Sequence, residues 1–307
     1  MLGRECRAFS SNTSSQTLKD IPADVLSKAR KMAPGVGLFA GIFGSCVGVG
    51  GGVLIVPTIT SACPSIAQRI VSGTSLAAVL STALASATVF SQGGCVDVGA
   101  AAVISPVAAL MAPLGARLTM RLDCNALKRI LGFFLLFVGP IVPLKSYLFA
   151  HNTTDDGSSD EDNGNEGNKE QQQSEKKSSQ TPMDVPTIAI LSATGAVAGL
   201  ASGILGIGGG TVVTPLLALA LPLTQSQVLG TSLLAMIPPS AAALFQHHRL
   251  GNVDWRMAAG LSLGTAVGAG AGSVAALKAP DGVLECIFAL GMLFLGRKTL
   301  QGVKKKV

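Results

Sequence analysis

The sequence is poor in charged and aromatic residues. Only 13% of its 307 residues are Asp, Glu, Lys or Arg, and 4% are Phe, Trp or Tyr, whereas about 25% of a soluble globular domain is charged. The charges are also segregated, and five segments contain none: residues 32–68, 70–96, 98–116, 185–248 and 257–277. About 20 apolar residues cross the hydrocarbon core of a bilayer. The scarcity of charge therefore argues against a soluble domain and predicts an integral membrane protein.

Motifs for the common soluble chemistries are missing as well. Neither glycine run is followed by the Lys of a phosphate-binding loop, and Val53 and Thr211 stand where a dinucleotide fingerprint needs glycine. The six cysteines include no CxxC pair, and the three histidines belong to no metal-ligand or Ser-His-Asp set. Much of the formal charge of +6 lies in the termini, as at Lys304, Lys305 and Lys306. We therefore expect no enzymatic activity, no cofactor, no metal ion and no nucleic-acid partner.

The chain divides into two hydrophobic halves joined by a polar linker. Residues 151–184 are acidic, rich in Ser and Gln, and almost free of apolar side chains, a composition typical of a disordered segment. We predict a polar N-terminal tail over 1–32 and a first transmembrane repeat over 33–150. A second transmembrane repeat over 185–300 and a basic C-terminal tail over 301–307 follow the linker.

The two halves are related by an internal duplication. With an offset of 158, six of 17 positions between residues 41 and 57 have an identical partner in the second half. With an offset of 157, GTSL at 73–76 matches GTSL at 230–233, and GCVD at 94–97 matches GNVD at 251–254. Each half holds about four hydrophobic segments. We therefore expect an all-α integral membrane protein of two repeats, each with a glycine-broken first helix.

The path of the glycine-broken segments stays open at this stage. If each segment crosses the membrane, the halves are parallel and 17 of the 23 Lys and Arg residues face the cytosol. If each segment re-enters, the halves are inverted and the number is 18. The positive-inside rule does not separate the two arrangements. Length favours one broken crossing, because about 23 helical residues reach roughly 35 Å.

The glycine runs indicate a binding site. Non-helical backbone inside hydrocarbon must be buried in protein or line a polar cavity, because each unsatisfied peptide group costs several kcal/mol. A break also exposes the N-terminus of a half-helix, whose N–H groups and positive dipole end favour an anion. We predict anion binding by Gly48, Gly50, Gly51, Gly52, Gly206, Gly208, Gly209 and Gly210. Close helix packing is the alternative, and it better explains the helically spaced Gly37, Gly41, Gly44 and Gly199.

Hydroxyl side chains of the two GTSL motifs are a second group of candidates. These are Thr74, Ser75, Thr231 and Ser232, at the start of the second segment of each half. An N-cap or an interhelical hydrogen bond is one explanation for them, and a place in the anion site is the other. Asp97 and Asp254 precede the third segments, where we predict that they are helix N-caps.

The motifs together resemble a known family. The second half carries Gly199, Gly203 and the GIGGG run, then Pro215, GTSL and HRLGNVDW, in that order. This order is similar to that of the TauE/SafE group of sulfite and organosulfonate exporters. The first half departs from it, with Ser45 where the second half has Gly203 and with no His or Trp around GCVD. The resemblance covers 33–300 apart from the linker and implies a multi-pass permease for sulfur-containing or related organic anions.

The expected function is transport of a small anion across a lipid bilayer. Sulfite and organosulfonates are the expected substrates, and alternating access would rock one half against the other. A passive anion channel and a non-transporting scaffold that uses the linker to bind partners are the alternatives. The sequence leaves open the plasma membrane or an organelle membrane, and a homodimer is one assembly that it allows.

Overall fold

The computed structural model describes residues 21–63, 65–66, 68–118, 136, 184–221 and 223–280, with scattered positions between 283 and 297. All regular structure in these residues is helical. The helices are α2 (Ala23–Val47), α3 (Gly52–Ala62), α4 (Gln68–Gln92), α5 (Val98–Leu118), α8 (Val185–Leu205), α9 (Gly210–Ala220), α10 (Gln225–Ala235), α11 (Ile237–Arg249) and α12 (Trp255–Lys278). The predicted linker apart from Asp184, the basic C-terminal tail, most of the N-terminal tail and nearly all of the first half's fourth segment lie outside the described residues.

The described helices include five stretches long and apolar enough to cross a membrane. These are Arg69–Gln92, Val98–Leu118, Val185–Leu205, Gln225–Arg249 and Trp255–Lys278. The fourth stretch joins α10 to α11 and is interrupted at Met236. Pro238 and Pro239 follow this interruption, and because proline has no N–H group, two hydrogen bonds of a continuous helix are missing there. The spans confirm a multi-pass membrane protein.

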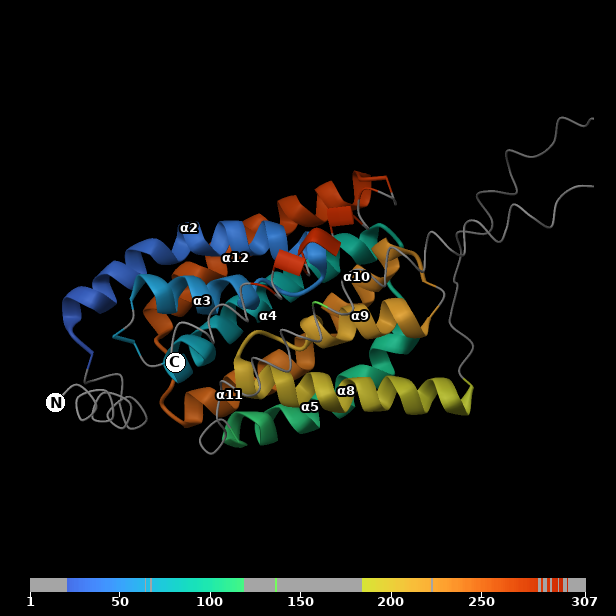
Figure 1. Cartoon of the computed structure of the whole chain (residues 1–307), viewed down its shortest axis with the longest axis horizontal. Helices are drawn as coiled ribbons and strands as arrows, with labels where there is room; N and C mark the ends of the chain where they lie inside the picture. The colour runs from blue at the N-terminus through green and yellow to red at the C-terminus, as the bar shows by residue number, and fades with distance from the viewer. Residues whose placement is uncertain are drawn as a thin grey trace, which may run out of the picture.

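Each glycine run reverses the direction of the chain. A Cβ atom built on Gly51 would lie 2.7 Å from the carbonyl oxygen of Ala40, and one on Gly209 would lie 2.9 Å from that of Ala198. Residues separated by eleven positions in a straight helix lie about 16 Å apart. Helix α3 therefore runs back along α2, and α9 runs back along α8 (Figure 1).

The expectation of a single broken crossing is thus wrong. Helix α2 ends at Gly48 with φ 72° and α8 ends at Gly206 with φ 64°. In this left-handed conformation a glycine closes the last turn and lets the chain leave the helix axis. The number of residues in the segment sets only how far it can reach. It does not show in which direction the second helix leaves the glycine break.

The two halves run in opposite directions through the bundle. Helices α2 and α8 begin at opposite ends of the molecule in Figure 1. A Cβ atom on Gly73, near the start of α4, would lie 3.2 Å from Cβ of His247 near the end of α11. One on Gly230, near the start of α10, would lie 2.9 Å from Cβ of Phe90 near the end of α4. The repeats therefore have inverted topology, which is a recurrent plan in secondary transporters.

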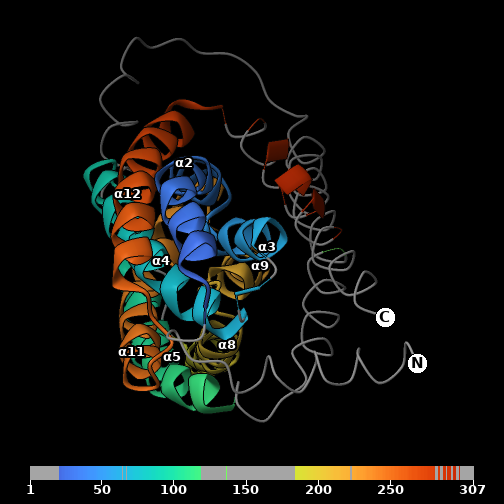
Figure 2. The same cartoon turned by 90° about the vertical axis from the view of Figure 1, so that its left-hand side faces the viewer.

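Helices of one half pack against hairpins of the other. Helix α12 of the second half lies along α2 and α4, and α5 of the first half lies along α8 and α11 (Figure 2). Glycines allow this close approach: Gly37 and Gly41 face the backbone of α12, and Gly199 faces the backbone of α5. The packing role predicted for these three glycines is confirmed. Gly44 also packs closely, but against Gly51 in its own hairpin.

Two neighbouring glycines of α12 provide a test of this packing. A Cβ atom on Gly268 would collide with the carbonyl oxygen of Leu38 in α2, whereas one on Gly270 would meet no atom within 4 Å. We expect Gly268→Ala to lower the free energy of unfolding by about 1–3 kcal/mol, because two helix backbones must separate. Gly270→Ala should raise it by about 0.5–1 kcal/mol, because alanine favours the helix. Unfolding of both variants in detergent measures this, and equal effects would contradict it.

Candidate functional site

The two glycine breaks lie against each other in the interior of the bundle. A Cβ atom on Gly210 would lie 2.7 Å from the carbonyl oxygen of Gly48, and one on Gly52 would lie 2.8 Å from that of Ile207. All the residues of both breaks, 48–52 and 206–210, are buried. The structure therefore brings the eight candidate glycines together at one place, where the first half meets the second.

The breaks differ in conformation at one pair of equivalent positions. Gly50 and Gly208 both have positive φ, 80° and 78°. Gly51 also has a positive φ of 71°, whereas the equivalent Gly209 has φ −71°. The start of α9 is thus turned differently from the start of α3.

This difference changes which backbone N–H groups remain unused. In the first break, Val49 donates to the carbonyl of Gly44 at 2.9 Å and Gly52 donates to that of Gly50 at 2.9 Å. In the second break, the described part of the chain provides no acceptor for the N–H groups of residues 208–211. The N-terminus of α9 therefore presents several hydrogen-bond donors together with the positive end of a helix dipole.

The serines of the two GTSL motifs hold the opposite break in place. Ser75 of the first half donates to the carbonyl of Gly206, and Ser232 of the second half donates to that of Gly48 at 3.3 Å. Thr214 on α9 donates to the same Gly48 carbonyl at 2.7 Å. These bonds satisfy the last carbonyls of α2 and α8, which would otherwise be buried without partners.

The threonines of the GTSL motifs also connect the two halves. Thr74 accepts from the backbone N–H of Asp254 at 3.1 Å, and Thr231 accepts from that of Asp97 at 2.8 Å. The interhelical hydrogen bonds considered for these motifs are thereby confirmed. The contribution of their hydroxyl groups to anion binding stays a prediction.

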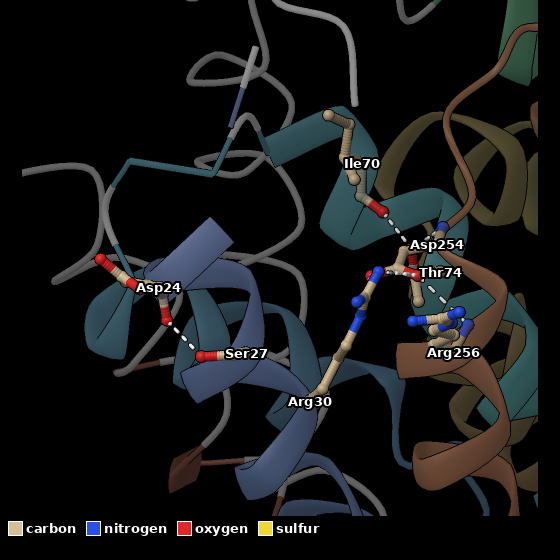
Figure 3. Close-up of polar contacts among 7 residues, drawn as sticks. All are labelled: Asp24, Ser27, Arg30, Ile70, Thr74, Asp254 and Arg256. Carbon is tan, nitrogen blue, oxygen red and sulfur yellow. Dashed lines mark hydrogen bonds and ion pairs between the residues drawn. The ribbon is translucent and has the colours of Figure 1, made fainter. Parts of the chain in front are cut away.

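Asp97 and Asp254 are N-caps, as their positions predicted. The carboxylate of Asp97 accepts from the N–H of Ala100 at 3.1 Å, and that of Asp254 accepts from the N–H of Arg256 at 3.1 Å. Asp254 also receives two hydrogen bonds from the guanidinium of Arg30, at 3.0 and 3.1 Å, which link α2 to α12 (Figure 3). The carboxylate thus combines a cap with an ion pair between helices from different halves.

Two substitutions at Asp254 separate its two roles. Asp254→Asn keeps an acceptor for the cap but removes the charge, whereas Asp254→Ala removes both. Because Asp254 is only 3% exposed, we expect the alanine variant to lower the free energy of unfolding by about 2 kcal/mol and the asparagine variant by about half as much. Denaturant titration in detergent measures both values. Equal losses would show that the cap contributes nothing beyond the ion pair, and an asparagine variant as stable as the wild type would show that the ion pair contributes nothing.

Two buried hydroxyl groups escaped the sequence reasoning. Ser202 in the last turn of α8 and Thr211 in the first turn of α9 are both fully buried, and neither Oγ atom has a hydrogen-bond partner in the described structure. Their equivalents in the first repeat are Gly44 and Val53, so a comparison of the repeats for polar substitutions would have found them. An unpaired buried hydroxyl costs about 1–3 kcal/mol.

The surroundings of the breaks carry no formal charge. Among the described Asp, Glu, Lys and Arg side chains, only Asp97 and Asp254 are buried. They cap α5 and α12, which begin at opposite ends of the bundle (Figure 1). The groups available to a ligand at the breaks are therefore backbone N–H groups and hydroxyls, a donor set that suits the oxygen atoms of an oxyanion.

An all-helical membrane protein with inverted repeats and two half-helices that meet between them has the architecture of a secondary transporter. A family model described as "Sulfite exporter TauE/SafE" matches residues 33–195 and again residues 191–306. The chain belongs to this family, which confirms the resemblance of its motifs. It is a member of a transporter family and not an enzyme, and the two successive matches agree with the internal duplication.

Similar proteins are described as membrane transporters. The chain is 23% identical over 267 residues to "Probable membrane transporter protein YunE" of Bacillus subtilis, covering 85% of this chain and 93% of the relative. It is 31% identical over 121 residues to a "Probable membrane transporter protein" of Xylella fastidiosa, covering 39% and 46%. A protein of Haemophilus influenzae with the same description is 39% identical over 69 residues, or 20% of this chain and 26% of the relative. No solved structure matches the chain significantly.

Proposed function

We propose that the protein is a secondary transporter of small oxyanions, with sulfite and organosulfonates as substrates. The observation that carries this proposal is the set of unused donors at the second glycine break. The N–H groups of residues 208–211 and the hydroxyls of Ser202 and Thr211 are buried without acceptors in the described structure. An oxyanion provides several acceptors within a few ångströms, and it would satisfy this group at the positive end of α9.

The absence of buried cations among the described residues suits release as well as binding. A helix N-terminus contributes the equivalent of about half an elementary charge, and its effect falls off within the first turn. An anion held by N–H groups and hydroxyls dissociates at a lower cost in free energy than one paired with a buried Arg or Lys. The site would therefore bind with modest affinity, which a transporter needs in order to turn over.

The moving bodies of alternating access would not be the two sequence halves. One body would contain α2, α3 and α4 with α12, and the other would contain α8 to α11 with α5, because these helices pack most extensively on one another. The two glycine breaks lie where these bodies meet. Rocking of one body against the other would open the breaks to each side of the membrane in turn. This replaces the expectation that one half rocks against the other.

The distribution of basic residues supports one orientation in the membrane. Arg69 is the second residue of α4, Arg117 lies near the end of α5, Arg249 ends α11 and Arg256 is near the start of α12. Figure 1 places these helix ends at the end of the molecule where α2 begins. At the opposite end Lys278 closes α12. By the positive-inside rule, the end with α2 would face the cytosol and the linker would leave from the other side.

Flux through the purified protein tests the proposal. Proteoliposomes loaded with labelled sulfite are compared with liposomes that hold the same sulfite but no protein. Efflux is measured first, and then counterflow against unlabelled sulfite outside. We expect saturable efflux that unlabelled sulfite on the far side accelerates. Flux linear in concentration and without counterflow would favour a passive channel. Flux no faster than that of protein-free liposomes, for sulfite and for a panel of sulfonates, would contradict transport of these anions. It would favour the alternative of a non-transporting membrane scaffold.

A further inference from the structure

Two apolar side chains pack against both glycine breaks. A Cβ atom on Gly50 would lie 2.7 Å from Cε of Met236 and 3.2 Å from Cγ1 of Val79. One on Gly208 would lie 2.6 Å from each of the same two atoms. Val79 on α4 and Met236 between α10 and α11 are both fully buried. The same two side chains therefore contact an equivalent glycine in each repeat.

Val79 and Met236 are themselves equivalent positions of the two repeats. They are related by the offset of 157 that aligns the two GTSL motifs, and each lies four residues after the Ser of its motif. Each also faces the first residue of a half-helix, since Cγ2 of Val79 would lie 2.7 Å from a Cβ on Gly52, and Sδ of Met236 would meet one on Gly210. An oxyanion bound to the N–H groups at the start of α9 would thus have Met236 as its apolar neighbour.

We propose that Met236 and Val79 determine the largest anion that this site accepts. This inference rests on the proposed function. The oxygen atoms of the anion would point to the N–H groups of α9, so any organic substituent on its sulfur would point toward the Met236 methyl group and the Val79 side chain. Met236 has three rotatable bonds and can yield to a ligand, whereas the branched Val79 has a restricted χ1. A compact anion would need only a small displacement of Met236, whereas a longer chain would also have to displace Val79.

The location of Met236 favours such a role. It stands where the span of α10 and α11 is interrupted before Pro238 and Pro239, and its N–H donates to the carbonyl of Ser232 at 3.1 Å. The hydroxyl of Ser232 in turn donates to the carbonyl of Gly48. Because the Met236 methyl group lies against Gly50 as well as Gly208, a ligand that displaces it from the second break would also change its packing against the first.

Selectivity between two anions of different length tests the inference. Efflux of sulfite and of propane-1-sulfonate is measured in proteoliposomes for the wild type and for Met236→Ala, Val79→Ala and Met236→Leu. The two alanine variants should raise the ratio of propanesulfonate to sulfite flux by about tenfold or more, the range expected when an apolar pocket gains space for one or two methylenes. Met236→Leu conserves volume and should keep the ratio close to that of the wild type.

The outcomes distinguish this inference from the proposed function. A rise of the ratio in either alanine variant that elutes and melts as a folded protein supports the inference, and the second variant decides if the first does not fold. An unchanged ratio in every alanine variant that folds overturns it while anion transport stands, and so does wild-type propanesulfonate flux equal to sulfite flux. A wild type that carries neither anion overturns the proposed function and the inference with it.

Discussion

Replacement of Gly208 by alanine is expected to abolish anion efflux in a chain that still folds. The added methyl group would lie 2.6 Å from both Val79 Cγ1 and Met236 Cε, and Gly208 has φ 78°. Met236 can move aside, but Val79 belongs to the middle of a long helix and cannot. The start of α9 must therefore shift. We expect efflux to fall by about a hundredfold, because misplacing binding groups by about 1 Å can cost that much.

Gly251→Ala is the matched control for this variant. Gly251 has φ 71°, close to that of Gly208, but a Cβ atom there would meet nothing within 4 Å. Both variants pay about 1–2 kcal/mol for a left-handed alanine, and only Gly208→Ala adds the collision at the break. Thermal unfolding in detergent establishes that each is folded, and sulfite efflux is then compared. Similar efflux from the two folded variants would show that the glycine breaks are not part of the transport path.

The Thr211→Val variant is expected to bind the anion more weakly and to fold more stably. Valine has the shape of threonine without the hydroxyl, and the equivalent residue of the first repeat is Val53. The buried Thr211 hydroxyl has no partner in the described structure, so its removal should raise the free energy of unfolding by about 1 kcal/mol. If the hydroxyl donates to the anion, the half-saturation concentration of sulfite should rise by about tenfold, since a hydrogen bond to a charged group contributes about 1.5–3 kcal/mol.

Thr82→Val provides the opposite pattern. Thr82 is also fully buried, but its hydroxyl donates to the carbonyl of Ala78 in its own helix at 2.9 Å. We expect this variant to be slightly less stable, with an unchanged half-saturation concentration. The two variants together separate a general effect of buried threonines from anion binding. A Thr211→Val protein that loses stability and keeps its affinity for sulfite would show that the hydroxyl has a structural partner and no ligand.

Part of the site was accessible from the sequence because the repeats could be compared. The glycine runs, the GTSL motifs and the two aspartates recur at nearly constant spacing. The two glycine runs contact each other, and the Thr of each GTSL motif accepts a hydrogen bond from the aspartate of the other repeat. Ser202, Thr211, Val79 and Met236 escaped notice because they differ between the repeats. Alignment by identity hides such positions, although they are where the two halves of a duplicated protein acquire different tasks.

The sequence by itself determined the membrane environment, the duplication, the family and the positions of the breaks and caps. The membrane environment follows from the hydropathy of about 20 consecutive residues, and the breaks and caps follow from single residues or short runs. The duplication and the family follow from motifs that recur along the chain. Only the tertiary structure decided that the chain reverses at each break and that α5 and α12 pack on the opposite halves. It also decided which donors pair with carbonyls and which stay unused. These properties depend on the φ angles of single glycines and on distances between residues more than 100 positions apart, which no short window of sequence contains.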